Sequence, residues 1–438
     1  MKDLRLENFR CYQHLEVNFK PGVNLLIGDN ASGKTSLILA CKYVLSSFFA
    51  GFSDENTKWV GPVANDFSVY AENGIIAPEQ PIILSFSYDS AIFPLLSGGS
   101  NVNKIQYLQK STKKNSRCQT KGLSEFKAYS RELQTQYVIK TSAGIQHTHP
   151  LPLFASFSTE DIHSNSKISR EKFKSYNQKR SFGYYECLES NGLLNHWLKR
   201  LLVLEEAHRN NIELSVVKAA VNAALGPDGC NIISDIEVRP NQSRVYVIFT
   251  DGRECDVTLL SDGYRRLVNI VIDIALRAAL LNGAYYGDET LERTRGTVLI
   301  DEIDMHLHPS LQSCIVKGLT NAFPNIQFIL TTHAPMVMAS VQSNDNNAVY
   351  YLKYSGNSYE LSTVNVYGYD ISQLTELYLG VPPRPEFIHN VFQELMDMID
   401  NEQFAEAKIR LSDLKLQYGP DFPDLVKAQA LLDFYNVG

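Results

Sequence analysis

The sequence predicts an α/β fold, and three short segments carry that prediction. Each is an apolar run of strand length, and the three lie at 23–27, 297–300 and 325–330. Polar residues or glycine follow each run at once, which is the pattern of buried parallel strands with chemistry at their carboxyl ends. We therefore expect an α/β fold built on a mixed β-sheet.

The first strand leads into a glycine-rich loop, residues 28–35, which reads G-D-N-A-S-G-K-T, and a helical run begins at Ser36. This is a complete G-x-x-x-x-G-K-[ST] loop between a strand and a helix, the context that phosphate binding requires. Glycine at 28 and 33 lets backbone N–H groups approach phosphate oxygens, and the helix directs its positive dipole end at the same oxygens. We expect the nucleotide contacts to come from Gly28, Asn30, Gly33, Lys34 and Thr35, with the Thr35 hydroxyl on Mg²⁺. An ordinary surface turn is the alternative.

The second strand ends in two adjacent acids, Asp301 and Glu302. We expect Asp301 to bind Mg²⁺ and Glu302 to accept a proton from the attacking water. A solvated strand end is the alternative interpretation.

The third strand is closed by Thr331, Thr332 and His333. A histidine past a buried strand is most often a satisfied polar cap. If the strands before Glu302 and His333 are neighbours, however, both residues lie at one sheet edge facing the γ-phosphate, and His333 joins Glu302 in catalysis.

A second turn, Ser261-Asp262-Gly263, opens an apolar helix that we predict over 267–281. Its hydroxyl and free N–H groups form a second anion site. One nucleotide cannot use two such turns as primary cradles, so we expect a homodimer or higher oligomer in which the Ser261 turn of one subunit closes over the nucleotide of the other.

These four elements, in this order, resemble the ABC-type ATPases, and the opening L-E-N-F-R-C-Y at 6–12 looks like the first strand of their SMC and RecF branch. The resemblance implies an ABC-type ATPase head that uses ATP and Mg²⁺. It makes 28–35 the Walker A loop, 261–263 the signature, 299–302 Walker B and His333 the switch histidine. The signature departs from L-S-G-G-Q at Asp262 and Tyr264 but keeps Ser261 and Gly263.

The run D-E-I-D-M-H-L-H-P at 301–309 is similar to stand-alone bacterial ATPases of the virulence-associated and OLD groups and to the PtuA ATPases of Septu and retron antiphage systems. That resemblance implies a separate effector nuclease, of which the HNH type is one option. By register, His308 stands in the D-loop position, which would place it at the neighbouring subunit. His306 and His308 also have metal-ligand spacing, but we prefer the interface interpretation because no third histidine or cysteine is nearby.

The chain divides, on this interpretation, into four parts: an N-terminal lobe (1–92), an inserted basic region (93–180), the signature helices with the C-terminal lobe (181–383) and a helical tail (384–438). The tail shows apolar residues at helical spacing from Phe387 to Ile399, then a second helix over 404–416 and a third from Pro423. A short helical tail after a proline-rich break resembles that of the virulence-associated group.

Composition predicts a cytoplasmic protein. Seven cysteines are scattered without a C-x-x-C pair, which argues against a disulfide framework or a zinc site. The charged start is no signal peptide, and we expect no membrane-spanning run.

The net charge of −7 is unevenly distributed, because two stretches of the inserted region are basic. Their bases are Lys104, Lys110, Lys113, Lys114, Arg117, Lys121, Lys127, Arg131 and Lys140, and then Lys167, Arg170, Lys172, Lys174, Lys179 and Arg180. The interleaved aromatic residues are Tyr107, Phe126, Tyr129, Phe173 and Tyr176. Such a pattern fits DNA or RNA binding through phosphates and base stacking. A solvated surface or a partner-docking surface fits equally well.

Two functions remain open. The first is an ATPase that acts as sensor and scaffold for a separate effector nuclease in antiphage defence. The second is a RecF-like DNA-repair ATPase that clamps DNA by itself. We find no Q-loop glutamine between Trp59 and Tyr88.

Overall fold

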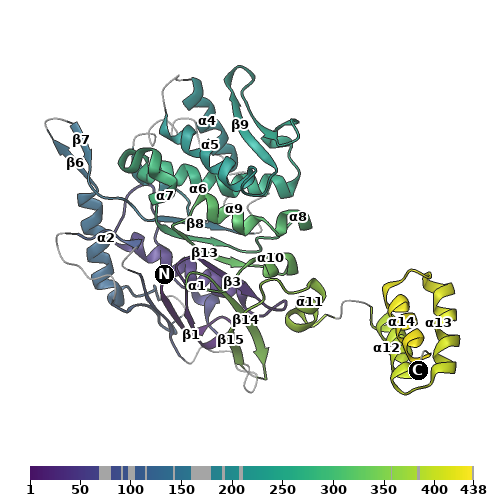
Figure 1. Ribbon diagram of the computed structural model, residues 1–438. Helices are drawn as coiled ribbons and strands as arrows, with labels where there is room; N and C mark the ends of the chain where they lie inside the picture. The colour runs from purple at the N-terminus through teal and green to yellow at the C-terminus, as the bar shows by residue number, and fades with distance from the viewer. Residues whose placement is uncertain are drawn as a thin grey trace. The chain divides into compact units, whose positions relative to one another are not determined.

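The computed structural model describes residues 1–68, 80–89, 92–96, 104–113, 116–141, 144–158, 179–189, 193–206, 211–356, 358–381 and 385–436. The chain divides into two compact units, Met1–Leu374 and Thr375–Gly438. The first unit contains a six-stranded sheet in the order β15-β14-β3-β13-β12-β8 (Figure 1). Its strands are β3 (Val23–Ile27), β8 (Leu153–Phe157), β12 (Gly296–Ile300), β13 (Ile326–Thr331), β14 (Ala348–Ser355) and β15 (Ser358–Val364).

The three predicted strands are β3, β12 and β13, so the expected α/β fold with a mixed sheet is confirmed. Every pairing in this sheet is parallel except that of β14 with β15. All residues of β3, β8, β12 and β13 are buried, which explains why these strands read as continuous apolar runs. Helix α1 (Lys34–Ser46) packs against β12 and β13, and α6 (Asp262–Tyr286) packs against β8.

An antiparallel sheet, β2-β1-β4-β5, lies in the same unit, together with a smaller sheet β11-β10-β9 and the hairpin β6-β7. These strands are β1 (Asp3–Phe9), β2 (Tyr12–Asn18), β4 (Ile82–Ser87), β5 (Gln106–Lys110), β6 (Val138–Thr141), β7 (Gly144–His147), β9 (Ile233–Arg239), β10 (Arg244–Phe249) and β11 (Glu254–Asp256). Up to the tail, the other α-helices among the described residues are α2 (Ser124–Gln136), α4 (Leu194–Glu206), α5 (Ile212–Leu225), α7 (Thr290–Arg293), α8 (Pro309–Gln312), α9 (Ile315–Ala322), α10 (Pro335–Ser340) and α11 (Ile371–Leu379).

Helix α6 corrects one expectation, because it belongs to the one helical stretch in the described ranges that is long and apolar enough to cross a membrane. The stretch is 89% buried over its most apolar window, and it carries ionic groups in the core. Arg277 donates to Asp273 at 2.5 Å, and the indole N–H of Trp197 donates to the same carboxylate. Its apolar length therefore reflects its place in the core.

The predicted insertion, 93–180, is built into the head at two places. Strand β5 pairs with β4, and β8 pairs with β12 in the central sheet. Between them, α2 buries Phe126 and Tyr129 in an aromatic cluster with Phe48, Tyr88 and Phe93.

Two basic residues of this stretch are buried and therefore do not contribute to a charged surface. Lys110 is 3% exposed and Arg180 is 6% exposed. Phe126 and Tyr129 are likewise in the core, so base stacking on them is excluded in this fold. Lys114, and the second cluster from Lys167 to Lys174 with Phe173 and Tyr176, lie outside the described residues. Among the side chains that the structure describes, the exposed bases of the first cluster are Lys104, Lys113, Arg117, Lys121 and Arg131.

The tail forms the three predicted helices, α12 (Glu386–Asp400), α13 (Phe404–Tyr418) and α14 (Pro423–Asn436). The unit has a core of its own, in which Leu395, Leu411 and Leu432 are among the buried residues. Pro382 to Arg384 of the predicted break lie outside the described residues.

Candidate nucleotide site

Three loops meet at the carboxyl edge of the central sheet, because β3, β13 and β12 are parallel neighbours in that order. Leu330 is in register with Leu25 on one side and with Ile300 on the other. The loop at 28–35, the acids at 301–302 and His333 follow these three strands directly. The prediction that the strands before Glu302 and His333 are neighbours is therefore confirmed.

The loop after β3 has the backbone that its glycines suggest. Gly28 has φ 144° and Gly33 has φ 96°, values that residues with a Cβ rarely adopt. A Cβ at Gly28 would lie 2.2 Å from the carbonyl oxygen of Leu352, and one at Gly33 would lie 2.4 Å from the hydroxyl of Tyr12. Larger residues are therefore excluded at both positions, and α1 begins at Lys34, directly after Gly33.

Lys34 folds its side chain back over this loop. Its ammonium donates to the carbonyl oxygens of Gly28 and Asp29, both at 2.8 Å, and to Ser32 Oγ at 3.1 Å. Burial lowers the pKa of Lys34 to about 8, and the carboxylates of Asp301 and Asp29 offset part of that effect. Asn30 and Thr35 are exposed on the same loop, where an incoming nucleotide can reach them.

The acids after β12 are held by Thr331 of the neighbouring strand. The Thr331 hydroxyl donates to Asp301 Oδ1 at 2.6 Å and accepts from the backbone N–H of Glu302 at 2.7 Å. Asp301 is buried and Glu302 is half-buried, with a left-handed backbone of φ 52°. One hydroxyl therefore fixes both the predicted Mg²⁺ ligand and the predicted base, and the sequence reasoning did not assign it that role.

His333 stands next to a third acid that the sequence reasoning also missed. Asp304 Oδ1 accepts from Thr332 Oγ1 at 2.5 Å and from the His333 N–H at 3.4 Å. Burial lowers the pKa of His333, and the positive charge of Lys34 acts in the same direction, while the carboxylates of Asp304 and Glu302 oppose it. His333 is therefore neutral near pH 7 and lies within the electrostatic reach of Lys34.

The second turn caps α6. Ser261 is the exposed N-cap residue, and Gly263 is buried in the first helical turn. The turn lies against the run that follows Walker B, because a Cβ at Gly263 would lie 2.3 Å from the carbonyl oxygen of His306. The structure thus brings the predicted signature and the predicted D-loop of one subunit together.

His308 is the exposed N-cap of α8, where its ring nitrogen Nδ1 lies 2.8 Å from Ser310 Oγ. This capping contact gives His308 a structural role within its own subunit. Among the residues that the structure describes, no group of three or more metal-ligating side chains surrounds His306 and His308. Its place at a subunit interface stays a prediction.

The end of strand β8 is a fourth chain segment at the same edge. It lies outside the range from Trp59 to Tyr88, where we expected a Q-loop glutamine and found none. The carbonyl of Phe157, the last residue of β8, accepts from the N–H of Asp301 at 2.9 Å. Ser158, which follows, therefore stands beside the acids.

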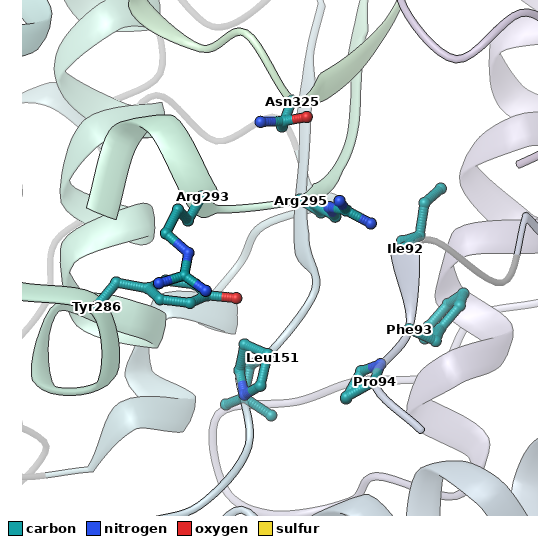
Figure 2. A pocket seen from close by; sticks show the side chains of 9 residues that line it. Ile92, Phe93, Pro94, Leu151, Tyr286, Arg293, Arg295 and Asn325 are labelled. Carbon is teal, nitrogen blue, oxygen red and sulfur yellow. The ribbon is translucent and has the colours of Figure 1, made fainter. Parts of the chain in front are cut away.

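A cavity of about 320 Å³ lies away from this edge, where the chain enters the strands (Figure 2). Leu151, Arg295 and Asn325 precede β8, β12 and β13, and Arg293 stacks over the ring of Tyr286 at 4.8 Å. In parallel α/β sheets, ligands bind at the carboxyl ends of the strands. The carboxyl edge is therefore the candidate site.

Together, a glycine cradle, a buried lysine, two acids on a neighbouring strand end and a histidine make a site suited to hydrolysis of a nucleoside triphosphate. The fold and this arrangement of residues are those expected of an ATPase. Two family models match the chain, "AAA domain" over residues 3–218 and "AAA domain, putative AbiEii toxin, Type IV TA system" over residues 121–339. The second spans half of the chain, and the chain belongs to that family.

Two relatives match over almost the whole chain. The "Retron Ec83 probable ATPase" of Escherichia coli is 25% identical over 97% of this chain and 85% of its own length. The Septu protein PtuA of Bacillus thuringiensis is 22% identical over 98% of this chain and 97% of its own length. The DNA replication and repair protein RecF of Limosilactobacillus reuteri is 56% identical over 46 residues, which are 10% of this chain. The chain is thus an ATPase by family, related to the retron ATPase and to the Septu protein PtuA, and the family implies that it binds ATP.

Proposed function

We propose that this protein binds and hydrolyses ATP in a sandwich dimer and that the dimer controls a separate effector nuclease in antiphage defence. The observation that carries the proposal is the shared sheet edge, where Lys34, Glu302 and His333 follow three neighbouring strands. The names of the retron and Septu relatives support the defence role.

The side chains at this edge fit ATP with Mg²⁺. The ammonium of Lys34 is held by carbonyl oxygens of its own loop, and phosphate oxygens would replace them as stronger acceptors for a cation. Thr35 and Asp301 would hold Mg²⁺, which when bound neutralises phosphate charge. Glu302 would accept the proton of the attacking water, while neutral His333 would donate a hydrogen bond at the γ-phosphate.

The decisive experiment for hydrolysis is Glu302→Gln. The variant should bind ATP with the affinity of the wild type and lose about 10²–10⁴-fold in turnover, because only the proton acceptor is removed. Phosphate release measures turnover, and a fluorescent ATP analogue measures binding. Glu406→Gln, an exposed change on α13 in the tail, is the control and should leave both quantities unchanged. Wild-type turnover in Glu302→Gln would reject the assignment of the base.

The dimer is tested on the Glu302→Gln background, where bound ATP persists. Ser261→Arg should leave ATP binding intact and prevent the ATP-dependent dimer, because the bulky cation would occupy the partner's phosphate pocket. Size-exclusion chromatography with light scattering distinguishes the two states. If the double variant dimerises like the single one, the sandwich model fails.

The effector is tested by purification of the tagged protein from its native host, followed by mass spectrometry. Copurification of a nuclease supports the scaffold role. ATP-dependent DNA binding by the isolated protein would instead support the RecF-like clamp, for which the exposed bases Lys113, Arg117, Lys121 and Arg131 are the candidate contacts.

A further inference from the structure

Arg266 connects the turn at Ser261 with the acids Asp301 and Glu302 of the same subunit. It lies in the first turns of α6, five positions after Ser261, and is 3% exposed. One guanidinium nitrogen, Nη2, donates to the carbonyl oxygen of Asp301 at 2.7 Å and to that of Glu302 at 3.0 Å. A charged donor therefore holds the backbone of the two acids from the signature side.

Glu302 is held from the opposite side as well. Its N–H donates to Thr331 Oγ1, so its peptide groups are fixed by α6 and by β13 at the same time. Its backbone has φ 52°, and His306 has φ 62°, a conformation that costs free energy in residues other than glycine. Such a backbone persists only where its surroundings hold it, and Arg266 is one of the groups that hold it.

The turn and the run of acids also touch directly. The backbone of Gly263 lies so close to His306 that there is no space for a Cβ between them. A small shift of the Ser261 turn therefore cannot be absorbed at this contact. It must move the run from Glu302 to His306 or break the bonds of Arg266.

We propose that Arg266 is a positioning residue that makes hydrolysis in one subunit depend on the nucleotide of the other. The inference rests on the proposed sandwich, in which the Ser261 turn of one subunit touches ATP bound to its partner. When that turn settles on the partner's phosphates, Arg266 carries the displacement to the carbonyls of Asp301 and Glu302. The carboxylate of Glu302 then takes its working position over the ATP of its own subunit.

The experiment uses two-tag heterodimers that isolate this dependence. One subunit is intact, and its partner carries either Glu302→Gln, which keeps ATP in the second site, or Lys34→Ala, which leaves that site largely empty when the ATP concentration is kept close to the Kd of the wild type. The ratio of turnover in the first heterodimer to turnover in the second measures the coupling. For an intact first subunit we expect a ratio of about 10 or more, within the usual range of coupling between sites.

The same ratio is then measured with Arg266→Met in the first subunit. The ratio should fall to about 1, because the thioether cannot donate to either carbonyl. Arg266→Lys retains a cation that can reach a carbonyl and should recover an intermediate ratio. Arg265→Met, at the preceding position of the same helix, is the matched control and should keep the ratio of the wild type. Because each ratio compares two heterodimers with the same first subunit, a general loss of stability cancels.

The outcomes separate the two proposals. Heterodimers without turnover in either form would contradict the proposed function itself. Turnover with a ratio near 1 for the intact subunit, or an unchanged high ratio in Arg266→Met, would overturn the role of Arg266 alone. If Arg266→Met does not fold, the ratio is measured in Arg266→Lys and in Arg266→Gln instead. A ratio equal to that of the wild type in both variants overturns the proposal.

Discussion

Charged residues are frequent both at the carboxyl edge of the central sheet and in the stretch 104–141, and some are buried in each region. The two regions differ in the groups that surround these buried charges. At the sheet edge, Lys34 and Asp301 are buried beside partners that a ligand can replace or join, such as loop carbonyls and a threonine hydroxyl. In the stretch 104–141, the ammonium of Lys110 is buried among the carbonyls of Ser111 and Lys113 and lies over the ring of Phe67.

This difference separates a chemical use of buried charge from a structural one. At the sheet edge, the carboxylates of Asp301 and Asp29 raise the pKa of Lys34 against the effect of burial, and the negative charge of a bound phosphate would act in the same direction. The buried cations that the structure describes in the inserted region 93–180, Lys110 and Arg180, donate to groups within the fold. Arg180, for example, donates to the carbonyls of Leu281, Tyr137 and His149. A count of bases in the sequence therefore overstates the charge that this region offers to a partner.

The largest expected effect tests the structural side of the comparison. Phe126→Ala should lower the free energy of unfolding by about 3–5 kcal/mol, because the ring packs in an aromatic cluster and stacks on Tyr88 at 5.0 Å. Arg131→Ala, exposed on the same helix, should change it by less than about 0.5 kcal/mol. Urea denaturation measures both. Equal effects would mean that α2 is not packed as described.

The next effect tests the chemical side. Lys34→Ala should weaken ATP binding by about 100-fold, since a charged hydrogen bond contributes about 1.5–3 kcal/mol. Lys353→Ala, an exposed change on β14, should leave the affinity unchanged. Isothermal titration with ATP and Mg²⁺ provides the measurement, and equal affinities in the two variants would remove Lys34 from the site.

A smaller effect follows from the pKa of Lys34, which burial lowers to about 8. Above that pH the free protein loses the ammonium proton, and ATP binding requires the charged form. The affinity for ATP should therefore be constant below pH 8 and fall about tenfold for each further pH unit. Lys34→Arg keeps its charge over this range and should show no such decline. A flat profile in the wild type would mean that Lys34 is charged throughout.

Sequence patterns predicted the site residues that follow a strand at a fixed spacing. They did not predict the contacts that form when strands far apart in the chain pair with each other. Lys34, Asp301 and His333 each follow a strand directly, so their common edge could be inferred. Thr331 lies beside Asp301 only because β13 pairs with β12, and the place of β8 beside β12 joins segments about 140 residues apart. No local pattern contains that information.

Lys110 shows a signal that the sequence did contain. In β5 the residues Gln106, Leu108 and Lys110 share one face, and all three are buried while Tyr107 is exposed. The alternation of a strand places Lys110 on the side of Leu108, toward the core. A count of basic residues cannot detect this, whereas the two-residue period can.

The smallest expected effect distinguishes the scaffold from the DNA clamp. Joint replacement of Lys113, Arg117, Lys121 and Arg131 by Glu changes only exposed bases and leaves the buried Lys110 in place. In the scaffold model, we expect weak binding of duplex DNA by the wild type and a change of only about threefold in the variant, because Lys110 and Arg180 are buried and fewer bases can therefore meet phosphates. Fluorescence anisotropy at several salt concentrations measures the affinity, and Lys408→Glu with Lys427→Glu on the tail is the matched control. ATP turnover should be unchanged in both variants.

If instead the wild type binds duplex tightly and the variant lowers the salt dependence by about one for each base removed, these residues meet phosphates and the clamp model is correct. Loss of a copurifying nuclease in the same variant, with DNA binding unchanged, would identify the surface as the docking site of the effector.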